Sequence, residues 1–175
     1  VKEISSIELL IVGDGPDKAA YEQLAVKLGI EKDVIFTGKA SWEDMPYYYH
    51  VADVFATASK TETQGLTVIE AMASNVVPVC MRDEAFQSMV TEDLNGLFFE
   101  TQDEYKKQIE FLYKNPKELS RIDNQARIQA EHYGSRNYAI SVLDVYDRAI
   151  KAKEAEYRFG IFSKVYNRIK EMFKW

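Results

Sequence analysis

Short apolar runs alternate with helical patterns along the first part of the chain. Five of these runs have the length and composition of buried strands, at residues 7–12, 34–38, 53–56, 76–81 and 97–99. Helical patterns separate the runs, and further helical patterns follow from Glu104 onward. Strands that alternate with helices across short connections form a parallel sheet with helices on its faces. The sequence therefore predicts an α/β fold, a doubly wound parallel sheet with trailing C-terminal helices.

The length and the cysteine usage narrow the class of protein further. A chain of 175 residues is enough for one domain with a substantial core. No apolar run approaches the roughly 18 residues that cross a bilayer, and the first residues lack a signal-peptide pattern. The single cysteine, Cys80, lies in an apolar strand, which excludes an internal disulfide and favours a buried, inert thiol in a reducing compartment. These features predict a cytoplasmic location.

The net charge of −6 is unevenly distributed. Residues 151–175 hold seven basic and three acidic side chains, whereas the preceding 150 residues hold 15 basic and 25 acidic ones. A nucleic-acid-binding domain carries its basic face on the folded core. The acidic body of this chain therefore argues against general nucleic-acid binding, and its basic end is a candidate for contact with an anionic surface.

The segment of residues 53–73 predicts an anion site. A strand gives way to small polar residues, and a run of helix formers starts at Leu66, directly after Gly65. The backbone of a glycine can approach a ligand closely, and a helix start offers unpaired N–H groups and a positive dipole end. Glu62 and Glu70 flank this helix start with seven residues between them. Either glutamate alone is typical of a solvated surface, but together they suit a nucleotide sugar, which has a diphosphate between two groups of hydroxyls.

Residues 62–73, Glu-Thr-Gln-Gly-Leu-Thr-Val-Ile-Glu-Ala-Met-Ala, resemble the E-x7-E signature of the retaining GT-B glycosyltransferases. The resemblance implies that the chain is the C-terminal, Rossmann-like half of a GT-B fold, which binds the donor. It implies that Glu62 is the catalytic-site residue that contacts the hydroxyls of the donor sugar. It also implies that Glu70 binds the ribose hydroxyls of the nucleotide.

The resemblance further implies that four residues between the glutamates meet the sugar and the diphosphate, namely Thr63, Gln64, Gly65 and Leu66. The family usually has the sequence Gly-Phe-Gly directly after the first glutamate. This chain has the last of these glycines, as Gly65, and has Thr63 in place of the first. The order Glu-Thr-Gln-Gly-Leu is similar to that of diacylglycerol glucosyltransferases from Gram-positive bacteria, which is a narrower match.

Two further loops are candidate donor contacts. Gly13-Asp14-Gly15-Pro16 follows the first strand and is similar to a second marker of the same enzymes, so Gly13 and Gly15 are expected beside the donor. Such turns also join strands to helices in many unrelated α/β proteins. Gly38 and Lys39 follow the second strand, where the family places the nucleotide base, although a glycine that merely ends a strand is equally consistent with the sequence.

The resemblance implies a hexosyltransferase that uses a nucleotide sugar, UDP-glucose, and transfers glucose to diacylglycerol or a related glycolipid without a metal or other cofactor. The alternatives are the same fold acting on a polysaccharide, a teichoic-type polymer or a protein, or a non-catalytic nucleotide-binding module. The family also has an N-terminal acceptor domain and basic diphosphate-binding residues that this sequence lacks. We therefore expect a fragment, inactive alone, whose partner is that N-terminal domain of the same parent protein.

The last stretch of the chain predicts a separate amphipathic element. Residues 1–155 are expected to form the donor domain, and residues 156–175 a basic and aromatic helix. Within Tyr157–Trp175, one helical face gathers apolar side chains, at Phe162, Val165, Tyr166, Ile169, Met172 and Phe173. Cationic residues border this face, as in helices that bind anionic membranes. The alternatives are contact with the inner face of the plasma membrane and docking on the N-terminal domain.

Overall fold

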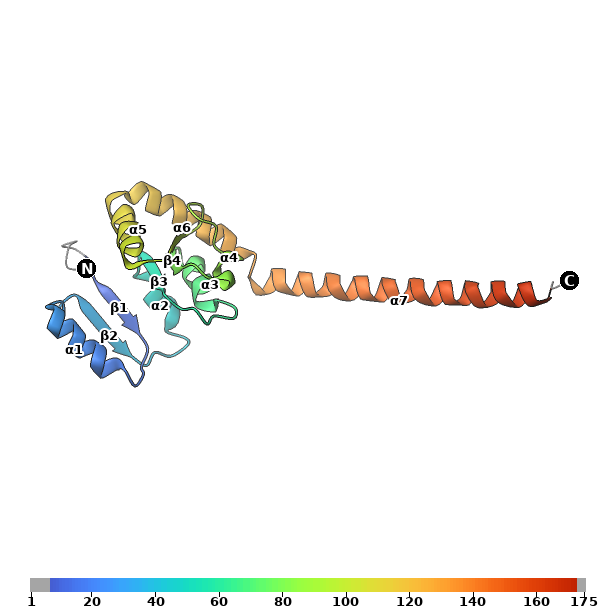
Figure 1. Ribbon diagram of the computed structural model, residues 1–175, viewed down its shortest axis with the longest axis horizontal. Helices are drawn as coiled ribbons and strands as arrows, with labels where there is room; N and C mark the ends of the chain where they lie inside the picture. Colours follow the sequence, from blue (N-terminus) through green and yellow to red (C-terminus); the bar gives the residue numbers. More distant parts are fainter. Residues whose placement is uncertain (1–6, 173–175) are drawn as a thin grey trace. The chain divides into compact units, whose positions relative to one another are not determined.

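The computed structural model of the chain describes residues 7–172, except for the side chains of residues 162, 166, 169, 170 and 172 (Figure 1). The chain divides into two compact units, Val1–Glu131 and His132–Trp175. The first unit contains all the described strands and six helices, and the second contains one long helix.

The strands of the first unit are parallel, as the sequence predicts. They are β1 (Leu9–Val12), β2 (Val34–Gly38), β3 (Val54–Thr57), β4 (Val77–Met81) and β5 (Leu97–Phe99). β1 pairs with β2, and the other three form a second sheet in the order β3-β4-β5. Parallel strands that alternate with helices confirm the predicted α/β architecture, and these strands lie in two sheets.

Helices alternate with the strands and then continue beyond them. They are α1 (Lys18–Leu28), α2 (Met45–His50), α3 (Leu66–Ala73), α4 (Glu84–Gln87), α5 (Gln102–Lys114) and α6 (Pro116–Glu131). α1 ends at Gly29, whose backbone is left-handed with φ +66° and whose N–H donates to the carbonyl of Val26 at 3.0 Å. A left-handed glycine after the last turn is a common helix stop.

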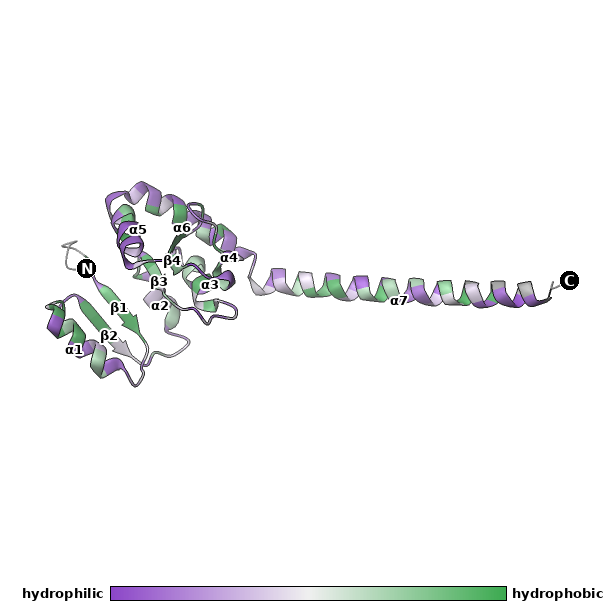
Figure 2. Cartoon of the chain, in the orientation of Figure 1, coloured by the Kyte–Doolittle hydropathy of each residue, from purple (hydrophilic) through white to green (hydrophobic). Residues whose placement is uncertain are grey.

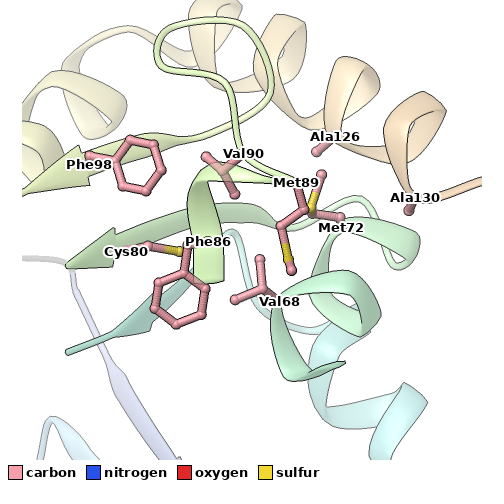
Figure 3. Close-up of a cluster of buried hydrophobic side chains, with 9 residues drawn as sticks. All are labelled: Val68, Met72, Cys80, Phe86, Met89, Val90, Phe98, Ala126 and Ala130. Atoms are coloured by element: carbon pink, nitrogen blue, oxygen red, sulfur yellow. The ribbon is translucent and has the colours of Figure 1, made fainter. Parts of the chain in front are cut away.

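The main core lies around β4, between helices of the first unit. One cluster joins side chains of α3, β4, α4, β5 and α6, drawn in Figure 3: Val68, Met72, Cys80, Phe86, Met89, Val90, Phe98, Ala126 and Ala130. A second cluster joins β4 and β5 to α5 and α6, with Val77, Val79, Leu97, Phe99, Leu112 and Ile122 fully or nearly fully buried. Figure 2 shows hydrophobic colouring along β1 and most of β2, and mixed colouring along the helices. Side chains on both faces of β4 are buried, which explains why its sequence is a continuous apolar run.

Cys80 lies within the first of these clusters and is completely buried and free. Burial raises the pKa of its thiol to about 12. Because the thiolate is the reactive form of cysteine, the thiol is inert at neutral pH. The interpretation of Cys80 as a core residue is therefore confirmed.

The second unit contains α7 (Ser135–Met172), a single helix of 38 residues. The boundary expected between residues 155 and 156 falls inside this helix. Several large apolar side chains along it are exposed, among them Tyr138, Leu143, Tyr146, Tyr157, Phe159 and Val165. Of the face expected on the tail, the side chains at 162, 166, 169 and 172 and all of residue 173 lie outside the described part of the chain. No helix within residues 7–172 is both long and apolar enough to cross a bilayer.

Candidate functional site

The turn into α3 has the backbone geometry of an anion site. Gly65 directly precedes the helix and is left-handed, with φ +58° and ψ 35°. Its carbonyl accepts the first hydrogen bonds of the helix, from Val68 N at 2.9 Å and Ile69 N at 3.2 Å. The N–H groups of Leu66 and Thr67 precede those bonds, at the end of the helix where the dipole is positive. The predicted helix start near Leu66 is confirmed.

Two observations favour glycine at position 65. The left-handed backbone costs about 1–2 kcal/mol for any residue with a Cβ atom. A Cβ atom built there would lie 3.0 Å from Met89 Cε and 3.3 Å from Phe86 Cδ1. The turn therefore packs directly onto the core, which fixes the position of the loop before it.

Glu62 and Glu70 lie on either side of this turn, in different surroundings. Glu62 is half-buried in the loop, and the side chains that follow it, Thr63 and Gln64, are exposed. Glu70 lies on α3, and its side chain is exposed. Glu70 Oε2 accepts a hydrogen bond of 3.0 Å from the hydroxyl of Tyr49, on α2. The structure thus places Glu70 where a ligand can reach its carboxylate while a buried tyrosine holds one oxygen.

Tyr49 lies beside the candidate site through its hydrogen bond to Glu70, a contact that the sequence alone did not predict. Of the successive tyrosines on α2, Tyr49 is 7% exposed, whereas Tyr47 is 72% exposed. Burial, followed by the neighbouring charge of Glu70 and the hydrogen bond to it, raises the pKa of Tyr49 well above its usual value. The phenol therefore stays protonated and acts as a donor to Glu70 at neutral pH.

The first two loops come together as a second group of candidate residues. Gly13 N–H donates to the carbonyl of Gly38 at 3.0 Å, which joins the ends of β1 and β2. Both glycines have positive φ, +134° and +71°. Gly15 and Lys39 are exposed beside them in the sequence, and the N–H of Gly15 donates to Asp14 Oδ1 at 3.0 Å. The sequence predicts each loop separately, and the structure makes them one group at the carboxyl ends of two parallel strands.

Lys18 adds a cation to this second group. Its Nζ lies 3.7 Å from the position that a Cβ atom on Gly38 would take, and 3.8 Å from Glu22 Oε1. Ligands of open α/β sheets bind outside the carboxyl ends of the strands. Both groups of candidate residues lie at such ends, one after β1 and β2 and the other between β3 and α3. The arrangement suits an anionic ligand with hydroxyl groups.

Residues 1–129 match the protein family described as "Glycosyl transferases group 1". The chain belongs to this family. An alpha-monoglucosyldiacylglycerol synthase from Acholeplasma laidlawii is 33% identical over 145 residues, which are 83% of this glycosyltransferase chain and 36% of that protein. The synthase of the same name from Streptococcus pneumoniae is 31% identical over 139 residues, 78% of this chain and 32% of that protein. The glycosyltransferase chain thus spans about a third of the length of these curated relatives.

Solved structures show the same fold. The UDP-glucose complex of Anabaena Alr3699/HepE has a TM-score of 0.74 at 19% identity, and the match covers 83% of this chain and 42% of that chain. Sucrose-phosphate synthase from Thermosynechococcus elongatus has a TM-score of 0.75 at 22% identity, with 86% and 40% covered. These likenesses confirm that the glycosyltransferase chain has the Rossmann-like architecture of one half of a GT-B enzyme.

Proposed function

We propose that the chain is the donor-binding half of a retaining glycosyltransferase that transfers glucose from UDP-glucose to diacylglycerol or a related glycolipid. The observation that carries this proposal is the α3 site, where Glu62, Gly65 and Glu70 flank one helix start. The named activity of the two curated relatives supports the acceptor class. Their greater length supports an N-terminal acceptor-binding half as the partner of this domain.

In this proposal the diphosphate lies at the N-terminus of α3. The N–H groups of Leu66 and Thr67 point toward the departing diphosphate, and donors fixed in advance stabilise the charge that develops on it. Glu62 accepts hydrogen bonds from the glucose hydroxyls, and Glu70 accepts them from the ribose hydroxyls. Gly13, Gly38 and Lys39 border the nucleotide. The backbone donors of this domain offset part of the charge of the diphosphate, without a metal.

Nucleotide binding by the 175-residue chain tests this arrangement. We expect UDP and UDP-glucose to raise its melting temperature more than GDP or ADP, because a ligand at 100 times its Kd stabilises a protein by about 2.7 kcal/mol. Glu70→Gln removes a charged acceptor and should weaken both uridine ligands by about ten- to a hundredfold. Glu62→Gln should weaken UDP-glucose but leave UDP unchanged.

Glu31→Gln is the matched control for these variants. Glu31 is exposed and lies just before β2, at the amino end of that strand, opposite the site. Its replacement should leave all affinities unchanged, as measured by calorimetry. Equal loss of UDP and UDP-glucose in Glu62→Gln would contradict the assignment of Glu62 to the sugar. Unchanged UDP affinity in Glu70→Gln would contradict the assignment of Glu70 to the ribose.

The end of α7 is proposed to bring this domain to the inner, anionic face of the cytoplasmic membrane. Tyr157 and Phe159 are 71% and 78% exposed, and the neighbouring Arg158, Lys164 and Arg168 are exposed cations. Exposed aromatic side chains beside basic ones are typical of helices that bind in the membrane interface. Each basic residue near an anionic leaflet contributes about 1 kcal/mol.

Co-sedimentation with vesicles tests the membrane contact. The chain should bind vesicles that contain phosphatidylglycerol and not vesicles of phosphatidylcholine alone. The double variant Tyr157→Ser, Phe159→Ser should lose most of this binding. A matched pair on the same helix, Ile140→Ser with Leu143→Ser, removes similarly exposed apolar side chains and should keep it. Equal loss in both pairs, or binding that persists in the first, would contradict the role of Tyr157 and Phe159. Absence of vesicle binding by the unaltered chain would favour docking of the tail on protein.

A further inference from the structure

A hydrogen bond connects the candidate ribose-binding glutamate to a buried tyrosine of another helix. Tyr49 OH lies 3.0 Å from Glu70 Oε2, although the two residues are 21 positions apart in the sequence. Glu70 is on α3, whose start forms the anion site, and Tyr49 is in the last turn of α2. The bond therefore links the orientation of a site carboxylate to the core between two helices.

The ring of Tyr49 is firmly held. It is buried in a cluster with Ala71 and Val76, and its centroid is 5.9 Å from that of Phe55, at an interplanar angle of 59°. Packing fixes both of its side-chain torsions, so its hydroxyl has one position. Glu70, by contrast, is exposed and has three rotatable bonds. Without a partner its carboxylate samples many orientations, and fixing such a side chain has an entropic cost.

We propose that Tyr49 is a positioning residue for the donor nucleotide: its hydroxyl holds Glu70 Oε2 so that the carboxylate accepts both ribose hydroxyls at once. An ionised carboxylate has about four lone-pair sites, and the hydroxyl of Tyr49 uses one of them. The sites that remain on the exposed side match the two donors of a cis-diol. This inference rests on the proposed role of Glu70.

The chemistry of the pair suits such a role. A neutral phenol donates to the carboxylate without cancelling its charge, so Glu70 remains a strong, charged acceptor. A lysine or arginine in the same place would form an ion pair and compete with the ribose. Because Tyr49 orders the carboxylate before the ligand binds, the entropic cost of fixing the Glu70 side chain does not reduce the affinity. The benefit appears only for a ligand that contacts Glu70.

The affinities of Tyr49→Phe for UDP and for 2′,3′-dideoxy-UDP test the proposal. The dideoxy compound has no hydroxyl for Glu70 to accept, so the wild-type chain should prefer UDP by about ten- to a hundredfold. Tyr49→Phe should weaken UDP by about three- to tenfold and leave the dideoxy compound unchanged, because only the ordering of Glu70 is lost. In a Glu70→Gln background the same substitution should have no further effect on UDP.

Tyr105→Phe is the matched control. Tyr105 is a partly buried tyrosine whose ring lies 5.0 Å from that of Phe99, and burial raises its pKa as well. It lies on α5, and its replacement should change neither affinity. This variant removes a partly buried phenolic hydroxyl that does not contact Glu70. It therefore measures the general effect of losing a tyrosine hydroxyl on ligand affinity.

Each other outcome overturns a specific part of the inference. If Tyr49→Phe weakens both compounds equally, Tyr49 has only a structural role. If Tyr49→Phe keeps the full preference for UDP, it does not position Glu70, and the proposed function of the site stands without it. If the wild-type chain does not distinguish UDP from the dideoxy compound, Glu70 does not bind the ribose. The proposed site and this inference then fail together.

Discussion

Replacement of Phe86 by alanine is expected to lower the free energy of unfolding by about 3–5 kcal/mol. Phe86 is fully buried on the short helix α4, in the cluster of Figure 3. Its ring faces the turn at Gly65, since a Cβ atom on that glycine would lie 3.3 Å from Phe86 Cδ1. Alanine would leave a cavity under the turn that carries the site. Urea denaturation measures the loss, and UDP affinity should fall with it as the turn loses its support.

Phe111→Ala is the comparison that isolates the effect of burial on the free energy of unfolding. Phe111 is on α5 and is 39% exposed, so the same change of side chain removes less area from the interior. We expect it to cost about 1 kcal/mol, from apolar area alone. Equal costs at the two positions would mean that the cluster around Phe86 closes over the missing ring, and that α4 does not support the Gly65 turn.

Most of the fold could be predicted because its signals are local. The apolar runs fall on the five strands, and Gly29 and Gly65 mark a helix end and a helix start. A local capping signal does not always mark the first residue of a helix. Ser41 and Asp44 form a capping pattern, and Asp44 N–H does donate to Ser41 Oγ at 3.2 Å. That bond closes a turn, however, and α2 begins only at Met45.

Strand pairing and helix continuity were harder to predict. Which strands are neighbours depends on contacts between residues far apart in the sequence, and apolar periodicity carries no information about them. The charged segment 152–156 resembles a linker, yet α7 continues through it. Alternating charges three and four residues apart stabilise a helix, and Lys151–Asp147 and Lys153–Glu156 are such pairs, at 2.6 and 3.1 Å.

Part of the candidate site could be predicted from the local sequence, and part depends on packing between distant segments. Glu62, Gly65 and Glu70 could be predicted because one loop and one helix carry all three, so their spacing alone brings them together. The contact between Tyr49 and Glu70 could not, because three successive tyrosines point to different sides of α2 and only packing decides which one is buried. The bond from Gly13 N–H to the Gly38 carbonyl likewise depends on the pairing of β1 with β2.

Gly96→Ala is expected to destabilise the protein strongly although it adds only one methyl group. A Cβ atom at position 96 would lie 2.8 Å from Pro78 Cγ and from Val90 Cγ1, and 2.9 Å from the Pro78 carbonyl oxygen. Overpacking a core costs about 1–3 kcal/mol and sometimes more, and here the obstruction includes the backbone of β4, which cannot turn away as a side chain can. We expect about 3 kcal/mol, which lowers the melting temperature by about 6–12 °C.

Gly15→Ala is the control for this prediction, since no atom lies within 4 Å of a Cβ built at position 15 and its backbone is not left-handed. It should change the free energy of unfolding by less than about 0.5 kcal/mol. The melting temperatures of both variants, compared with that of the wild type, test this prediction. If Gly96→Ala melts with the wild type, then β4 and the segment before β5 separate at little cost. β4 pairs directly with β3, which precedes the Glu62 loop, so such freedom would argue against a rigid support for the site.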